Sequence, residues 1–116
     1  MNEKELAVRF RPLLEAELAT LRAESASTAA DRAPVTLDQQ SVGRLSRMDA
    51  LQAQAMAQAT EKRRLQRLVQ IEAAFRRMAA GEYGYCATCG EAIAAKRLAA
   101  DPAAHLCVGC SKGARV

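Results

Sequence analysis

The sequence contains few aromatic residues and no tryptophan. Aromatic side chains make up 3% of its 116 residues, whereas alanine dominates the 50% that are hydrophobic. Because small side chains bury little area each, a large globular core is not expected. A small module without such a core needs another source of stability, which favours an elongated helical structure with one end held by a metal ion.

The sequence also lacks the features of a membrane protein, a secreted protein or an enzyme. No run approaches the roughly 18 apolar residues of a membrane span, and the N-terminal Met-Asn-Glu-Lys-Glu-Leu is charged where a secretory signal requires an apolar run. We therefore expect a cytoplasmic protein without membrane contact. No Ser/His/Asp set, glycine-rich phosphate loop or carboxylate pair beside an acid or base partner is found, so catalysis is not expected.

The strongest signal is a repeated Cys-x-x-Cys pair, with seventeen residues between the first pair and the second. This spacing is typical of a four-cysteine zinc site, because each pair can aim two thiolates at one ion from a tight turn. Gly90, directly after the first pair, suits such a turn. A full set of four cysteines leaves no coordination position for water, so we predict one structural zinc ion with the ligands Cys86, Cys89, Cys107 and Cys110.

Other uses of these cysteines fit the sequence less well. Two disulfides are disfavoured in a cytoplasmic protein, and a thioredoxin-like redox pair would require an alternation of strands and helices that the sequence does not show. His105, the single histidine, is a ligand candidate by its chemistry. With four thiols already in register, we expect its side chain at the surface or beside the ligands.

Hydrophobic periodicity predicts a first helix from Glu3 to about Thr28, where leucine and phenylalanine recur at spacings of three and four. Pro12 interrupts this pattern and predicts a kink or break near Arg11, because an interior proline loses a backbone hydrogen bond. The segment from Ser25 to Pro34 then loses its periodicity and gathers turn-forming residues. We expect the chain to reverse direction there.

A second, proline-free helix is predicted to begin between Thr36 and Asp38, where a capping box or a hydrophobic staple fits. It should end at Gly81, a natural stop for a helix. We interpret its stripe of leucine and methionine as the core of a helical hairpin rather than as a ligand surface. Beyond the first cysteine pair, a strand and a short turn are expected within residues 91–100.

Together these elements predict a mainly α fold, in which a long antiparallel coiled-coil hairpin is followed by a small four-cysteine zinc finger. The hairpin takes residues 1–80, with its tip near residues 28–38, and the zinc-finger module takes residues 81–116.

The net charge of +4 is concentrated in residues 38–80, which contain eight Lys or Arg and four acids. A basic helix face permits contact with an anionic partner without requiring it. This leaves a nucleic-acid-binding zinc finger as one interpretation, although aromatic residues for stacking on bases are scarce. A coiled-coil adaptor that uses zinc as a structural clamp is another.

The zinc-finger segment resembles the DksA/TraR family of bacterial transcription regulators over about residues 81–111. Its matching residues are more specific than four cysteines alone, and the long helices before them fit the family's architecture. They are Gly81, Tyr83, Gly84, Cys86, Cys89, Gly90, Ile93, Arg97, Leu98, Ala100, Pro102, Leu106, Cys107 and Cys110.

The resemblance implies a protein that binds RNA polymerase and not specific DNA. The zinc module and adjoining helices would dock at the rim of the secondary channel, and the hairpin would reach inward toward the catalytic centre. Acidic residues at the tip would then alter initiation. Some members of the family act together with guanosine tetraphosphate, for which we find no matching motif here; Arg63, Arg64 and Arg67 are candidates by charge alone.

The chain departs from the family at the hairpin tip. Well-studied members carry Asp-x-x-Asp-x-Ala, whereas here Asp31, Arg32 and Ala33 match the last three positions and Thr28 stands at the first. Asp38 lies near the tip as well, where it also suits a helix cap. We therefore name Asp31 and Asp38 as candidate polymerase contacts.

Overall fold

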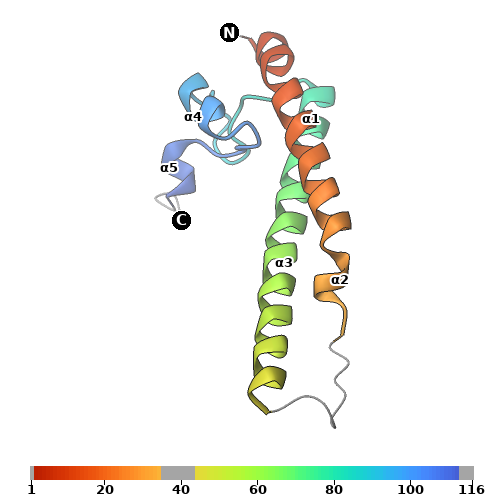
Figure 1. The fold of residues 1–116 in the computed structure, drawn as a ribbon. Coiled ribbons are helices and arrows are strands. Elements are labelled where there is room, and N and C mark those ends of the chain that lie inside the picture. The colour runs from red at the N-terminus through yellow and green to blue at the C-terminus, as the bar shows by residue number, and fades with distance from the viewer. Residues whose placement is uncertain (1, 35–43, 113–116) are drawn as a thin grey trace. The chain divides into compact units, whose positions relative to one another are not determined.

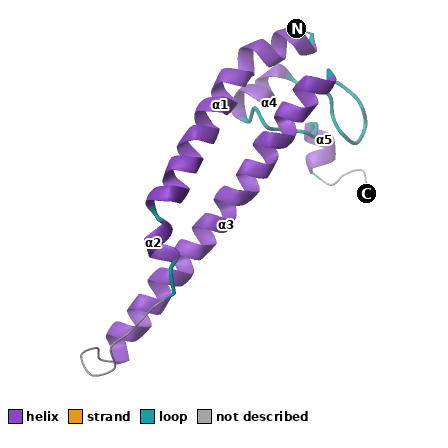
Figure 2. Cartoon of the chain, turned by 90° about the vertical axis from the view of Figure 1, so that its right-hand side faces the viewer, coloured by secondary structure: helices purple, strands orange, loops and turns teal. Residues whose placement is uncertain are grey.

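The fold is mainly helical, as the sequence predicted, in a computed structural model that describes residues 2–34 and 44–112. In the described part of the chain, extended pairing is limited to one antiparallel bridge between Tyr85 and Ala92, and no strand is drawn there (Figure 2). None of the helices in these residues is long and apolar enough to cross a membrane. The helices, coloured along the chain in Figure 1, are α1 (Glu3–Ser27), α2 (Ala29–Arg32), α3 (Arg44–Ala80), α4 (Ala95–Ala100) and α5 (Val108–Ser111).

The chain forms two compact units. The first unit comprises Met1–Ala19 and Leu68–Val116, and the second comprises Thr20–Arg67. Each unit therefore contains part of α1 and part of α3. The division at residue 80 between a helical hairpin and a finger stays a prediction.

The core of the first unit joins α1 and α3 to the cysteine-containing segment. From α1, the large side chains of Leu6, Phe10 and Leu14 are buried at a spacing of one helical turn. The buried residues Ile71 and Ala74 come from α3. The segment beyond α3 contributes Tyr83, Ile93, Leu98, Ala103 and Ala104, all of which are buried.

Pro12 lies inside α1, which is one continuous helix from Glu3 to Ser27. The expected break near Arg11 is therefore wrong, whereas a kink there stays a prediction. An interior proline costs about 3 kcal/mol, whereas full burial of one large apolar side chain contributes about 1.5–3 kcal/mol. Phe10 and Leu14, on either side of the proline, are 1% and 0% exposed. The free energy gained by packing these two side chains therefore outweighs the tendency of Pro12 to break the helix.

The predicted end of the second long helix is confirmed. Gly81 follows α3 with φ of 74°, a left-handed conformation that glycine adopts without steric cost. The N–H of Gly81 donates to the carbonyl of Met78 (3.2 Å), and that of Glu82 donates to the carbonyl of Arg77 (2.8 Å). These two bonds form a Schellman motif, which satisfies carbonyls at the end of the helix. The predicted start of this helix between Thr36 and Asp38 lies outside the described residues.

Two further expectations are wrong in part. Most of the segment from Ser25 to Pro34 is helical, because α1 continues to Ser27 and α2 follows at once. Similarly, only Ala92 of residues 91–100 is in extended pairing, and the second half of that range is the helix α4.

The second unit has no buried side chain among its described residues. Four of the leucines and methionines of α3 that we interpreted as hairpin core are exposed here: Met48 is 49% exposed, Leu51 47%, Met56 72% and Leu65 51%. That interpretation is wrong for this unit. Ser25 and Glu24 of α1 contact α3 through a hydroxyl and a carboxylate in this unit.

Glu61 of α3 is the centre of these polar contacts. Ser25 Oγ of α1 donates to Glu61 Oε2 (2.6 Å), while Arg32 Nη1 of α2 and Arg64 Nη1 of α3 lie 3.5 and 3.2 Å from Glu61 Oε1. Gln54 Nε2 donates to the carbonyl of Ala33 (2.8 Å). Because residue 25 pairs with residue 61 and residue 33 with residue 54, the two chain segments run antiparallel in this unit.

We predict that Gly84→Ala destabilises the first unit by about 1–3 kcal/mol. Gly84 has φ of 93°, and a Cβ there would lie 2.7 Å from Leu6 Cδ1, whose side chain is buried. Gly81→Ala is the matched control, since its φ is 74° but a Cβ would meet nothing within 4 Å. Denaturant unfolding should show the larger loss for Gly84→Ala; equal losses would contradict the predicted contact.

We also predict that Ser25→Ala raises the pKa of Glu61 toward its ordinary value of 4.5. The Ser25 hydroxyl is the largest cause of the lowered pKa, followed among the stabilising contacts by Arg64 and Arg32. Because the folded pKa is depressed, the carboxylate's contribution to stability is complete above about pH 4.5 and is lost as the pH falls through the folded pKa. NMR titration of the Glu61 carboxyl carbon measures the shift. Ser27→Ala, which removes a hydroxyl bonded to the Glu24 carbonyl, should leave it unchanged.

Candidate zinc site

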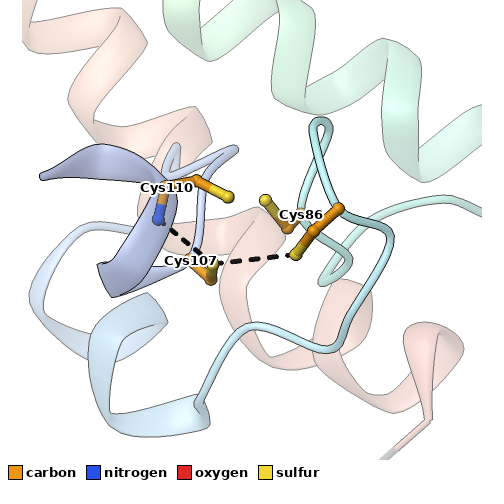
Figure 3. A group of neighbouring side chains, drawn as sticks. Cys86, Cys107 and Cys110 are labelled. Atoms are coloured by element: carbon orange, nitrogen blue, oxygen red, sulfur yellow. Dashed lines mark hydrogen bonds between the residues drawn. The ribbon is translucent and has the colours of Figure 1, made fainter. Parts of the chain in front are cut away.

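Two loops of the first unit bring the four cysteines together. Cys86 and Cys89 lie on the turn that follows Tyr85, whereas Cys107 is the N-cap of α5 and Cys110 lies within that helix. Figure 3 shows the side chains of Cys86, Cys107 and Cys110 converging on one another. Cys86 is buried and the other three are half-buried, and none of the four forms a disulfide.

The sulfur positions fit a tetrahedral zinc ion. All four Sγ atoms lie within 4.8 Å of one another, and those of Cys89 and Cys107 are 3.8 Å apart. Zinc–sulfur bonds of about 2.3 Å in a tetrahedron place neighbouring sulfurs about 3.8 Å apart. Four thiolates this close would repel one another strongly without a cation among them. The geometry therefore fits one structural zinc ion, as the sequence predicted.

Backbone hydrogen bonds shape each loop around its cysteine pair. In the first loop, the N–H of Gly90 donates to the carbonyl of Cys86 (2.9 Å), and Gly90 has φ of 76°. In the second, the N–H of Cys110 donates to Cys107 Sγ (3.5 Å). A bond from the N–H of Ala87 to the carbonyl of His105 (2.8 Å) ties the two loops together.

Backbone donors also favour the charged form of two of the ligands, since the N–H of Cys110 lowers the pKa of Cys107 and other N–H groups lower that of Cys86. The N–H groups of Cys89 and then Cys107 lower the pKa of the Cys86 thiol to about 5. By contrast, burial, followed by the neighbouring thiols, raises the pKa of Cys110 to about 12. A bound zinc ion would supply the positive charge that stabilises all four sulfurs as thiolates.

Side chains from α3 and α4 hold the segment between the cysteine pairs. Arg77 Nη2 donates to the carbonyl of Ala103 (3.3 Å), and Arg97 Nε donates to the carbonyl of Leu106 (2.8 Å). The hydroxyl of Tyr83 donates to the carbonyl of Pro102 (2.6 Å), and burial raises its pKa to about 12.

Sequence reasoning missed these supporting roles. An arginine such as Arg77, which bonds a distant backbone carbonyl, has no local sequence signature. The sequence contained a weak indication that Arg97 has a role, because Arg97 is one of the residues that match the pattern of the DksA/TraR family.

The side chains of the other candidate residues that the structure describes are not part of the cysteine cluster. The His105 side chain is exposed, and the metal-binding group found among the described residues consists of the cysteines. Asp31 lies on α2 in the second unit, where it lines a small cavity of about 190 Å³ with Thr28 and Arg64. Asp38 lies outside the described residues.

Comparison with known proteins points to one family. Residues 81–114 match the model of the prokaryotic dksA/traR C4-type zinc finger. A segment of 46 residues is 41% identical to the RNA polymerase-binding transcription factor DksA of Haemophilus influenzae, and it covers 40% of this chain and 32% of that protein. The chain thus spans about a third of the length of this curated relative.

A solved structure extends the likeness in fold. Transcription factor DksA2 from Pseudomonas aeruginosa matches 97% of this chain and 79% of its own, with a TM-score of 0.60 and 23% sequence identity. At this identity the match establishes a shared fold. Together the matches confirm the resemblance drawn from residues 81–111.

We predict that Cys86→Ser lowers the zinc content from about one ion per chain to about zero and unfolds the segment after α3, because binding and folding free energy are coupled in such modules. His105→Ala is the control and should keep its zinc, since the imidazole is exposed. Metal analysis and far-UV circular dichroism measure both effects. Full zinc retention by Cys86→Ser would exclude a four-cysteine site.

Proposed function

We propose that this chain, which carries a zinc finger of the DksA/TraR family at residues 81–114, is a non-catalytic transcription regulator that binds RNA polymerase at its secondary channel. The observation that carries the proposal is the cysteine cluster within the zinc-finger match at residues 81–114. A 46-residue segment of the chain also matches a protein whose name states that it binds RNA polymerase.

The site residues of the proposal fall into two groups. We assign the Sγ atoms of Cys86, Cys89, Cys107 and Cys110 as the zinc ligands. The ion has a structural role, because four protein ligands leave no position for water or substrate. It would fix the finger that docks at the channel rim, in a cytoplasmic protein.

Asp31 is the proposed contact near the catalytic centre of the polymerase. It is exposed on α2, so its carboxylate can meet a partner without first losing a buried contact. Asp38 is a second proposed contact on sequence grounds alone.

Guanosine tetraphosphate is a proposed co-effector on family resemblance alone, and no residue is assigned to it. Of the basic candidates, Arg64 already lies 3.3 Å from Glu24 Oε2 and 3.2 Å from Glu61 Oε1. A nucleotide would have to compete with both carboxylates for this guanidinium.

Competition for core RNA polymerase tests the proposal. The zinc-loaded protein should displace a secondary-channel ligand at micromolar concentration, and a crosslinker at position 31 should label the polymerase near its catalytic loop. A crosslinker at the exposed Lys96 of α4 is the matched control and should label only the channel rim.

Absence of displacement would refute the polymerase proposal. Direct DNA binding with a steep salt dependence would instead support the nucleic-acid interpretation, because each neutralised phosphate releases counterions.

A further inference from the structure

The α2 turn, which carries Asp31, is held by charged groups rather than by a core or a cap. In the described residues of the second unit no side chain is buried, and Thr28, the N-cap of α2, makes no side-chain cap bond. Such a short helix has little stability of its own. Its placement must therefore come from side chains that reach it from α1 and α3.

Arg64 of α3 contacts side chains from three parts of this unit. Its Nε lies 3.3 Å from Glu24 Oε2, and its Nη1 lies 3.3 Å from Thr28 Oγ1 and 3.2 Å from Glu61 Oε1. The guanidinium thus bridges α1, the junction before α2 and its own helix. A rigid fork of donors suits this task, whereas a lysine presents one compact charge.

The hydroxyl of Thr28 is fully used at this junction. It donates to the carbonyl of Glu24 (2.7 Å) and accepts from Arg32 Nη1 (2.8 Å) and Arg64 Nη1 (3.3 Å). One donor and two acceptor positions are all that a hydroxyl offers. Three residues after Thr28, Asp31 lines the same small cavity as Arg64.

We propose that Arg64 is a positioning residue, which fixes the α2 turn so that Asp31 is presented to RNA polymerase in one orientation. This inference rests on the proposed function. Arg64 acts through Thr28 and Glu61 and does not itself touch the polymerase. The Arg64 side chain is 16% exposed and that of Glu61 12%, so added salt should weaken these contacts only in part.

The test compares Arg64→Gln with Arg63→Gln. Both remove one positive charge from neighbouring positions, but Arg63 contacts Thr60 of its own helix at 3.1 Å. In Arg64→Gln, hydrogen exchange of the amides in residues 28–33 should rise about tenfold, as expected for a loosened local element. In the same variant, hydrogen exchange in residues 69–80 and the zinc content should stay at wild-type values. In Arg63→Gln, exchange in residues 28–33, exchange in residues 69–80 and the zinc content should all stay at wild-type values.

A double-mutant cycle with Asp31→Asn separates positioning from direct contact. If Arg64 acts through Asp31, then Arg64→Gln should reduce the transcription effect as much as Asp31→Asn does, and the double variant should lose no more. The double variant should behave in this way because residues that act as one unit are non-additive in function. The affinity of Arg64→Gln for core polymerase should change by less than about threefold.

The outcomes distinguish this inference from the proposed function. Suppose that the wild-type protein regulates transcription. If Arg64→Gln then regulates equally well, or if the losses caused by Arg64→Gln and Asp31→Asn add fully, the positioning role alone is overturned. Unchanged exchange in residues 28–33 would overturn it too. A wild-type protein that does not bind polymerase would refute the proposed function and this inference with it.

Discussion

The convergence of four sulfur atoms on one zinc ion is the constraint on which the first unit depends. The segment after α3 buries few large side chains, chiefly Tyr83, Ile93 and Leu98, and its helices have only six and four residues. Such short elements do not hold a unique arrangement by themselves. Zinc joins two loops that lie seventeen residues apart in sequence, and its binding free energy becomes folding free energy. The buried contacts with α1 and α3 then have a fixed surface to pack against.

The second unit uses a different source of order, and the contrast has physical consequences. Its described helices meet through Glu61, Arg64 and hydroxyl groups, with no buried side chain. Such contacts stabilise less than a core does, because partly exposed ion pairs gain little over their hydration. They are directional, however, since each hydrogen bond fixes an angle as well as a distance. A segment that must hold one orientation without a large core benefits from this property.

The sequence predicted those features that depend on short-range patterns. The clustering of the four cysteines follows from their spacing, and the end of α3 follows from the conformational freedom of Gly81. Pro12 misled the prediction, because the burial of Phe10 and Leu14 is a tertiary effect that local propensity does not include. The periodicity of α3 identified an apolar face but not whether a partner covers it. The contact between Ser25 and Glu61 joins residues 36 apart, and nothing local marks such a pair.

The departure from the acidic tip motif of the DksA/TraR family is connected to the polar contacts around Thr28, Glu61 and Arg64. Thr28 stands where well-studied members have the first aspartate, and in this chain its hydroxyl both donates to the Glu24 carbonyl and accepts from two arginines. An ionised aspartate could accept but not donate. It would also add a negative charge to a cluster in which Glu24 and Glu61 already balance Arg32 and Arg64. With threonine the cluster stays neutral, and Asp31 is the acid of this turn that remains exposed for a partner.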